Sequence, residues 1–286
     1  MKPLEDFREY LAQQRRLSPR SVEAYVCATR AYLGYLRDHG LSPESVNQAM
    51  VRAYLKQREQ AGLGPAGIHQ AILGLRHFYR FLGDDAPTAG IALPKLRPKL
   101  PEPLSREEIE RLLDQPGGPR FVHVRDKAIL ELLYATGLRV SELLALDEDQ
   151  VVPEGRTVRV LGKGGRERIV PFGNRAARAL EHYHAARKKR FPKVAGVLFL
   201  TARGGPLRRT HLWRRLKDYA RQAGIKRRVS PHVLRHSFAT HMLSGGADLR
   251  ALQAMLGHRR ITTTERYTHV EPEHLRRVWD RAHPLS

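Results

Sequence analysis

Residues 230–270 read SPHVLRHSFATHMLSGGADLRALQAMLGHRRITTTERYTHV, a segment that predicts two helices followed by a polar tail. On the first helix, His232 and Arg235 lie three positions apart, so their side chains leave the same face about one turn from each other. An imidazole and a guanidinium can therefore point at one small target. The tail adds His258 directly after the second helix and Tyr267 after a short polar run.

The side chains of this segment suit chemistry on a phosphate ester. A guanidinium can bind two oxygens of one phosphate, an imidazole exchanges a proton near neutral pH, and a phenol becomes a nucleophile once its proton is removed. Together they predict phosphoryl transfer through a covalent phosphotyrosine. A lone tyrosine after a polar run is more often an ordinary surface residue, so the prediction depends on the whole set rather than on Tyr267 alone.

His232 and His236 also lie four positions apart on the predicted helix, which is a spacing found in helical metal sites. The segment has neither the glutamate of an H-E-x-x-H motif nor an accompanying cluster of cysteines. We therefore expect no metal at this position and no cofactor.

The composition indicates a globular protein that binds a polyanion. A chain of 286 residues with 41% hydrophobic residues has room for two ordinary domains. Its 51 Lys and Arg residues exceed its 29 Asp and Glu residues, which gives a formal net charge of +22. This excess is too large for a protein whose partners are neutral metabolites.

The cysteine content and the hydropathy pattern predict a soluble cytoplasmic protein. The single cysteine, Cys27, cannot support a disulfide framework, and the first residues lack the apolar core of a signal peptide. No apolar run reaches the roughly 18 residues that a membrane helix needs. We therefore expect no membrane association.

Residues 1–84 predict a small domain of four helices. Apolar residues recur at helical spacing over residues 3–16, from Pro19 to about Gly40, from Pro43 onward and from Pro65 onward. Serine or glycine followed by proline precedes the last three of these helices and is a typical helix start. Four helices with short joints favour a compact bundle.

Residues 85–103 predict a linker. Several prolines occur there, with Lys95, Arg97 and Lys99 among them. Prolines keep the chain extended, and the basic residues suit a path along a phosphate backbone. Two basic domains joined by a basic tether predict a clamp around a DNA duplex.

Residues 104–286 predict a second domain that carries the chemistry. An apolar helix over residues 121–136 ends at Gly137, and Arg139 lies at the start of the next helix, where free backbone N–H groups also attract an anion. The alternative is a surface arginine that pairs with Glu142, three positions further along.

The hydrophobic period then changes from that of a helix to that of a strand. Residues 157–161 and 168–172 alternate in the manner of a β-hairpin, with Lys163 at its glycine-rich tip. The tip lacks the G-x-x-x-x-G-K-[ST] pattern of a nucleotide-binding loop. A solvated turn lysine is the alternative to a functional one.

The remaining segments are alternately apolar and basic. The pattern predicts a helix over residues 174–190, a strand over residues 197–200 and a basic helix within residues 203–228. That helix has a buried stripe with arginines opposite, which predicts DNA contact, although a merely solvated face is the alternative. A last amphipathic helix, at about residues 272–282, is too short to be stable alone and must dock on its own domain or on a neighbour.

Taken together, these segments resemble the tyrosine recombinases of the phage integrase family, and most closely the bacterial Xer-type enzymes. The resemblance covers nearly the whole chain. We expect no arm-binding domain before residue 1, which favours the Xer branch. The motifs that carry the resemblance are Ala135-Thr136-Gly137-Leu138-Arg139 with Ser141-Glu142-Leu143, Gly162-Lys163-Gly164, His232-x-x-Arg235-His236, Leu256-Gly257-His258 and Thr263-Thr264-x-x-Tyr267-Thr268-His269.

The resemblance implies a mainly α fold with a small β-sheet. An N-terminal four-helix, SAM-like core-binding domain would precede an α+β catalytic domain of the DNA breaking-rejoining fold. The helix at about residues 272–282 would be exchanged between neighbouring subunits. In such a site a tyrosine attacks the scissile phosphate, arginines and histidines hold that phosphate and move protons, and a lysine protonates the leaving oxygen. The implied catalytic residues are Arg139, Lys163, His232, Arg235, His258 and Tyr267.

The resemblance also implies the biological role and the partners. A metal- and ATP-independent recombinase would act on double-stranded DNA with an inverted-repeat site, as a homo- or hetero-tetramer on two DNA sites, to resolve chromosome dimers before cell division. A septal DNA translocase is a further expected partner. The alternatives are a type IB topoisomerase, a mobile-element integrase and a non-catalytic architectural DNA-binding protein.

Overall fold

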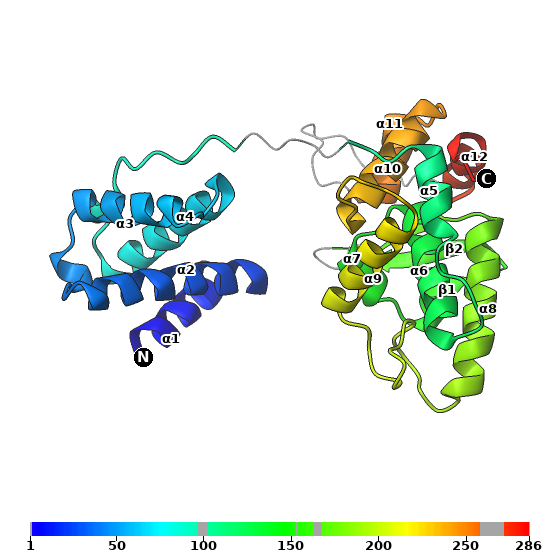
Figure 1. Ribbon diagram of the computed structural model, residues 1–286, viewed down its shortest axis with the longest axis horizontal. Coiled ribbons are helices and arrows are strands. Elements are labelled where there is room, and N and C mark those ends of the chain that lie inside the picture. Colours follow the sequence, from blue (N-terminus) through cyan, green and yellow to red (C-terminus); the bar gives the residue numbers. More distant parts are fainter. Residues whose placement is uncertain (1, 97–101, 153, 163–166, 258–271, 286) are drawn as a thin grey trace. The chain divides into compact units, whose positions relative to one another are not determined.

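The computed structural model describes residues 2–96, 102–152, 154–162, 167–257 and 272–285. The chain divides into two compact units, Met1–Lys99 and Leu100–Ser286, each with its own hydrophobic core. Among the described residues, no helix combines the length and the apolar character needed to span a membrane. Figure 1 shows the helices and strands of both units.

The first unit consists of helices around an aromatic core. Its longest helices, α2 and α4, pack against each other, and Gly74 on α4 lets the backbone of α2 approach closely. The Ser18 side chain caps α2 by accepting a hydrogen bond from the Ser21 amide, as the sequence predicts. The elements are α1 (Lys2–Glu9) with a π-helical turn (Tyr10–Gln14), α2 (Pro19–Asp38), α3 (Gln48–Gln60) and α4 (Pro65–Leu82).

Two local predictions for this unit need correction. The third helix does not begin at Pro43, because Pro43–Ser45 forms a separate 3-10 turn and α3 starts at Gln48, capped by the Asn47 side chain. The proline-rich segment is also not extended from its start, since Ala86–Thr88 forms a 3-10 turn and Ile91 is buried in the core of the helical unit.

The second unit is built around α6. This helix is buried on almost all sides from Ala128 onward and packs against α8 and α10. A capping box between Ser105 and Glu108 opens α5, as predicted. The helices are α5 (Arg106–Leu113), α6 (Phe121–Thr136), α7 (Val140–Leu144), α8 (Asn174–Arg190), α9 (Arg209–Gln222), α10 (Pro231–Ser244), α11 (Leu249–Leu256) and α12 (Pro272–Ala282).

A three-stranded antiparallel sheet lies beside these helices. The predicted hairpin is confirmed as β2 (Thr157–Leu161) and β3 (Glu167–Pro171), and a short strand not predicted from the sequence, β1 (Val151–Val152), pairs with β2. The strand order is β1-β2-β3. Val158 pairs with Val170, and both face the core of the unit.

The predicted strand at residues 197–200 is wrong. This segment makes only isolated bridges, although Leu198 and Phe199 are fully buried. The Leu198 amide donates to the carbonyl oxygen of Leu146 at 2.7 Å, and the Tyr183 hydroxyl donates to the Leu198 carbonyl oxygen at 2.9 Å. The backbone of this segment is therefore hydrogen-bonded to a loop carbonyl and to a tyrosine hydroxyl. Its apolar residues indicate burial in the core and not a strand of a sheet.

The C-terminal helix α12 docks on the second unit of its own chain. The indole Nε1 of Trp279 donates to the Ala135 carbonyl oxygen at 2.8 Å, near the end of α6. Two glycines make room for it: a Cβ on Gly245 would lie 2.1 Å from the Ala282 carbonyl oxygen, and one on Gly173 would lie 2.4 Å from the Trp279 ring. The His283 ring stacks on Trp279, and burial lowers the pKa of His283 to about 3, so the docked ring is neutral.

Candidate active site

Arg139 and Arg235 come from different helices and meet at one carbonyl group. Helix α6 ends where Gly137 adopts a left-handed conformation, with φ of 61°, and a Cβ there would lie 2.4 Å from the Phe238 ring. Only glycine fits this turn, which places Arg139 at the start of α7. The turn therefore brings Arg139 toward the face of α10 that carries Arg235.

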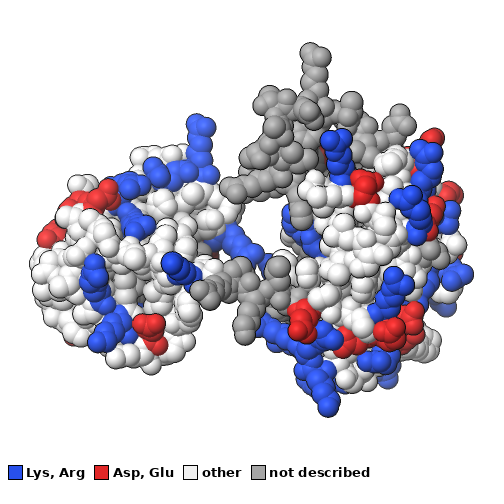
Figure 2. Space-filling model, turned by 90° about the horizontal axis from the view of Figure 1, so that it is seen from above, with Lys and Arg blue, Asp and Glu red and all other residues white. Residues whose placement is uncertain are grey.

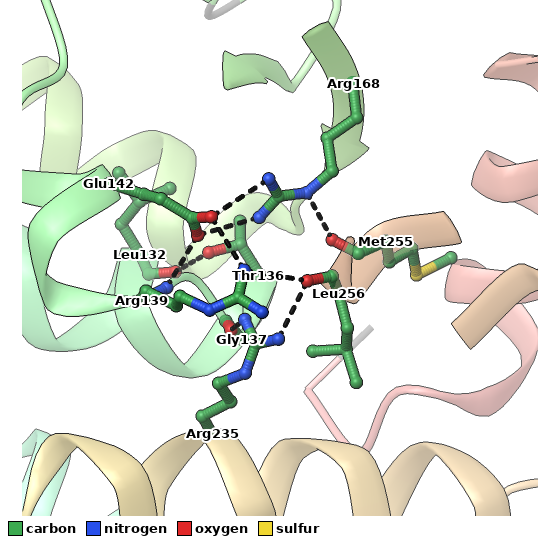
Figure 3. A network of polar contacts seen from close by, with 9 residues as sticks. All are labelled: Leu132, Thr136, Gly137, Arg139, Glu142, Arg168, Arg235, Met255 and Leu256. Atoms are coloured by element: carbon green, nitrogen blue, oxygen red, sulfur yellow. Dashed lines mark hydrogen bonds and ion pairs between the residues drawn. The ribbon is translucent and has the colours of Figure 1, made fainter. Parts of the chain in front are cut away.

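Figure 3 shows the guanidinium groups of Arg139 and Arg235 directed toward the Leu256 carbonyl oxygen at the end of α11. Arg235 Nη2 donates to this oxygen at 2.8 Å, and Arg139 Nη1 donates to it at 3.4 Å. Arg235 Nη1 also donates to the Gly137 carbonyl oxygen at 2.7 Å. Two cations separated widely in sequence are thus held against the C-terminal ends of two helices, where carbonyl groups lack helical partners.

Glu142 supplies the negative charge beside these arginines. Its Oε1 accepts from Arg139 Nη1 and its Oε2 accepts from the Arg139 backbone amide, each at 2.9 Å. The pairing that the sequence offered as an alternative is therefore present, and it coexists with the approach to Arg235. Burial alone would raise the pKa of Glu142, but the hydrogen bonds from Arg168 and Arg139 and the charge of Arg168 outweigh it and keep that pKa below its usual value.

Arg168 is the residue of this network that the sequence did not single out. It lies on β3, and its Nη1 and Nη2 donate to the two carboxylate oxygens of Glu142 at 3.2 and 2.8 Å. Its Nε donates to the Met255 carbonyl oxygen at 2.8 Å. In the sequence it is one arginine in a basic hairpin. The available signal is its position two residues before Val170, which places both side chains on the inward face of the strand.

The site carries more positive than negative charge. Burial, and secondarily the nearby charge of Arg139, lowers the pKa of Arg235 to about 10. The guanidinium remains protonated at neutral pH, but its surroundings do not fully compensate its charge. Three guanidinium groups and one carboxylate leave a formal local charge of +2, which favours binding of an anion.

His232 lies on α10 one turn before Arg235, as the helical spacing predicts, and it is exposed. Lys163, His258 and Tyr267 lie outside the described residues. Within the described parts of the chain, His, Cys, Asp and Glu side chains form no group of three or more that could hold a metal ion.

A basic surface accompanies the site on α9. Leu212, Leu216 and Ala220 form the buried stripe that the sequence predicts, while Arg214 and Lys217 are exposed. The helix is anchored inward by a further arginine, Arg215, whose Nε donates to Oδ2 of the buried Asp126 on α6 at 2.8 Å. Figure 2 shows Lys and Arg side chains spread over the visible face of each unit.

Comparisons with known proteins agree with this architecture. The family description "Phage integrase family" matches residues 102–274, and "Phage integrase, N-terminal SAM-like domain" matches residues 4–85. Tyrosine recombinase XerD of Shewanella oneidensis is 42% identical over 292 residues, which cover 99% of this chain and 97% of that protein. Tyrosine recombinase XerC of Myxococcus xanthus is 40% identical over 294 residues, covering 99% of this chain and 89% of that protein.

Solved structures show the same fold. The crystal structure of XerA recombinase covers 99% of this chain and 98% of its own, with a TM-score of 0.53 and 28% identity. The XerH site-specific recombinase, bound to a palindromic difH substrate, covers 90% of this chain and 78% of its own, with a TM-score of 0.71 and 21% identity. The two matched domains and the length of these similarities lead to one conclusion: the chain belongs to the phage integrase family and is a site-specific tyrosine recombinase of the Xer type.

Proposed function

We propose that this recombinase cuts and rejoins DNA through a 3'-phosphotyrosyl bond at Tyr267 and resolves chromosome dimers before cell division. The observation that carries the proposed site is the convergence of Arg139 and Arg235 on the Leu256 carbonyl oxygen. His258 follows that carbonyl by two positions in the sequence. A phosphate bound between the guanidinium groups would therefore lie near the segment that leads to the proposed nucleophile.

Arg139 and Arg235 would hold the two non-bridging oxygens of the scissile phosphate. In the transition state the phosphorus is five-coordinate and these oxygens carry the developing charge. Guanidinium groups already fixed by carbonyl and carboxylate partners need little reorganisation to meet that charge, which is the condition under which such donors are most effective. The local excess of positive charge around Glu142 supports this role, since one phosphodiester charge would reduce it.

The transfer steps balance without an external energy source. The Tyr267 oxygen forms a bond to phosphorus, the bond to the 5'-oxygen breaks, and the phenolic proton passes to His232. Lys163 gives a proton to the departing 5'-oxygen, and His258 hydrogen-bonds the phosphate. Attack by a 5'-hydroxyl from a partner duplex reverses these steps, so the phosphodiester energy is kept in the covalent link and neither ATP nor a metal is consumed.

Lys163→Ala is expected to slow cleavage strongly on ordinary DNA and to cleave at close to the wild-type rate when the 5'-bridging oxygen is replaced by sulfur. A thiolate leaves without protonation, so it removes the need for a general acid. The measurement is the single-turnover rate of adduct formation on the two substrates. Arg178→Ala, an exposed change on α8, is the control. Persistence of the defect on the sulfur substrate would remove Lys163 as the general acid.

The proposed substrate is double-stranded DNA with an inverted-repeat site. Both units would hold the duplex, and four protomers, identical or from a sister recombinase, would join two such sites. Exchange of α12 between neighbours is also proposed: the surface on which it docks, around Ala135, Gly173 and Gly245, is present in every protomer and would accept the same helix of a neighbour. We place the enzyme in the cytoplasm, with a septal DNA translocase as a proposed activator.

Three rivals predict different results. A type IB topoisomerase would relax plasmid DNA as a monomer without a preferred site. A mobile-element integrase would join sites on separate molecules, and an architectural protein would bind DNA without cutting it. The relatives named XerD and XerC support the chromosomal role.

One experiment tests the proposal directly. Footprinting on genomic fragments should reveal an inverted-repeat site, and a nicked duplex of that site should trap the protein covalently on the 3'-phosphate, in the presence of EDTA and without ATP. The same site placed twice on a plasmid should recombine. Site-independent relaxation without recombination would favour the topoisomerase, and binding without an adduct would favour the architectural protein.

A further inference from the structure

Arg168 binds Glu142, which is the ion-pair partner of the proposed phosphate-binding residue Arg139. Two of its nitrogens bind both oxygens of Glu142, in the bidentate geometry that fixes a guanidinium in orientation as well as in position. The third nitrogen, Nε, binds the Met255 carbonyl oxygen at 2.8 Å. Its side chain is 12% exposed, against 41% for Arg139, so Arg168 is the deeper of the two.

Glu142 is fully engaged by this arrangement. Each carboxylate oxygen accepts two hydrogen bonds: Oε1 from Arg139 Nη1 and Arg168 Nη1, and Oε2 from the Arg139 amide and Arg168 Nη2. A carboxylate offers about four acceptor directions. Without Arg168, the Glu142 carboxylate could rotate, because two of its four hydrogen bonds would be lost. The Arg139 guanidinium would then no longer be held in one position.

The end of α11 is shaped around the same side chain. Gly257 has φ of 65°, and a Cβ built on it would lie 3.2 Å from Arg168 Nη1 and 3.3 Å from its Cζ. The guanidinium plane therefore lies against Gly257. The carbonyl of the residue before it, Leu256, receives both Arg139 and Arg235. The Arg139 guanidinium is held by Glu142 and by the end of α11, and Arg168 contacts both of them.

We propose that Arg168 is a positioning residue that fixes Arg139 for phosphate binding by locking the Glu142 carboxylate between β3 and the end of α11. It touches no substrate itself. This inference rests on the proposed role of Arg139, and the sequence motifs of the site do not include it. Its effect on cleavage is exerted chiefly through Arg139.

A double-mutant cycle tests this dependence. Arg168→Ala should slow single-turnover cleavage of a saturated nicked site on the order of 100-fold, the scale of a displacement of about 1 Å in a reacting group. In an Arg139→Ala background, the same change should cost less than about threefold, because there is no guanidinium left to position. Arg168→Lys, which keeps the charge but cannot bind both oxygens, should recover part of the loss.

The controls separate positioning from other roles. Arg159→Ala removes an exposed arginine on neighbouring β2, whose ion pair to Asp149 is loose at 3.7 Å, and should change cleavage little. Site affinity at fixed salt should be unchanged by Arg168→Ala. If Arg168→Ala does not fold, the cycle is run with Arg168→Lys, whose smaller loss should likewise vanish in the Arg139→Ala background.

The outcomes are distinct. Equal losses in the two backgrounds would show that Arg168 acts independently of Arg139, by contacting DNA or supporting the fold, and would overturn the proposal. Rescue of Arg168→Ala by a 5'-sulfur leaving group would assign its effect to the hairpin lysine and would also overturn it. An Arg139→Ala protein that cleaves at the wild-type rate would instead refute the proposed active site, whatever Arg168 does.

Discussion

Tyr267→Phe is expected to bind its DNA site with wild-type affinity and to form no covalent adduct on nicked DNA. The change removes one oxygen atom and leaves the ring, so binding and folding should be preserved while the nucleophile is lost. The measurement is the yield of protein–DNA adduct after denaturing electrophoresis, with site affinity measured in parallel. The expected effect is complete loss of the adduct.

The other tyrosines of the second unit are poor candidates for this role. Tyr134, Tyr183 and Tyr219 are buried, and burial raises the pKa of each above its usual value. A raised pKa makes the phenolate harder to form. Their hydroxyl groups are also engaged, with His241, the Leu198 carbonyl and Asp126 respectively. The remaining tyrosine of this unit is Tyr267.

Tyr10→Phe is the matched control for this prediction. Tyr10 lies in the first unit, where its ring packs near Phe7 and Phe81, and loss of its hydroxyl should leave adduct formation unchanged. An adduct of normal yield from Tyr267→Phe would show that another residue attacks the phosphate. Proteolysis of the covalent adduct and sequencing of the peptide that stays on the DNA would then identify that residue.

Arg235→Ala is expected to slow cleavage on the order of 100- to 1000-fold, as loss of one preorganised donor to a transition-state oxygen does. The wild-type guanidinium is held by the Gly137 and Leu256 carbonyl oxygens, and these two bonds use two of its five N–H donors. The measurement is the rate of adduct formation at saturating protein. Because binding should change little, the loss should appear in the maximal rate rather than in the half-saturating concentration.

The pH dependence separates Arg235 from groups that exchange protons. The pKa of Arg235 is lowered to about 10 by burial and by Arg139, so the group is charged throughout the range from pH 6 to pH 9. Its charge would be lost only as the pH rises through about 10. Any pH dependence below pH 9 should therefore persist in Arg235→Lys, whose overall rate should lie between wild type and Arg235→Ala.

Two outcomes would contradict the assignment of Arg235. One is a cleavage rate within threefold of wild type for Arg235→Ala, with normal DNA binding. The other is a rate loss that Arg178→Ala, the exposed control on α8, reproduces, because that would indicate a general effect of removing positive charge.

Local sequence signals predicted the elements whose ends are marked by specific residues. Proline and serine mark the start of α2, and Gly137 marks the end of α6, because capping and left-handed turns depend on neighbouring residues alone. The sequence places the third helix too early, because Ser42 and Pro43 begin a 3-10 turn with the same signal. The strand prediction for residues 197–200 is wrong because a short apolar run indicates burial and not strand pairing.

The site was only partly predictable for a related reason. The spacing of His232 and Arg235 is local to one helix, and Arg139 was recognised from its motif. The contacts of Arg168 join segments 26 and 87 residues apart in the sequence, to Glu142 and Met255. No local pattern records such contacts, so the sequence alone does not distinguish Arg168 from its basic neighbours.

The last turn of α6 serves two structures at once. The Ala135 carbonyl oxygen receives the Trp279 indole of the C-terminal helix, and two residues later the Gly137 carbonyl oxygen receives Arg235. If α12 undocks, the Ala135 carbonyl oxygen loses its partner, and this carbonyl lies two residues before the one that holds Arg235. A substitution at Trp279 should therefore lower the rate of strand cleavage as well as the melting temperature, because undocking of α12 would also displace Arg235.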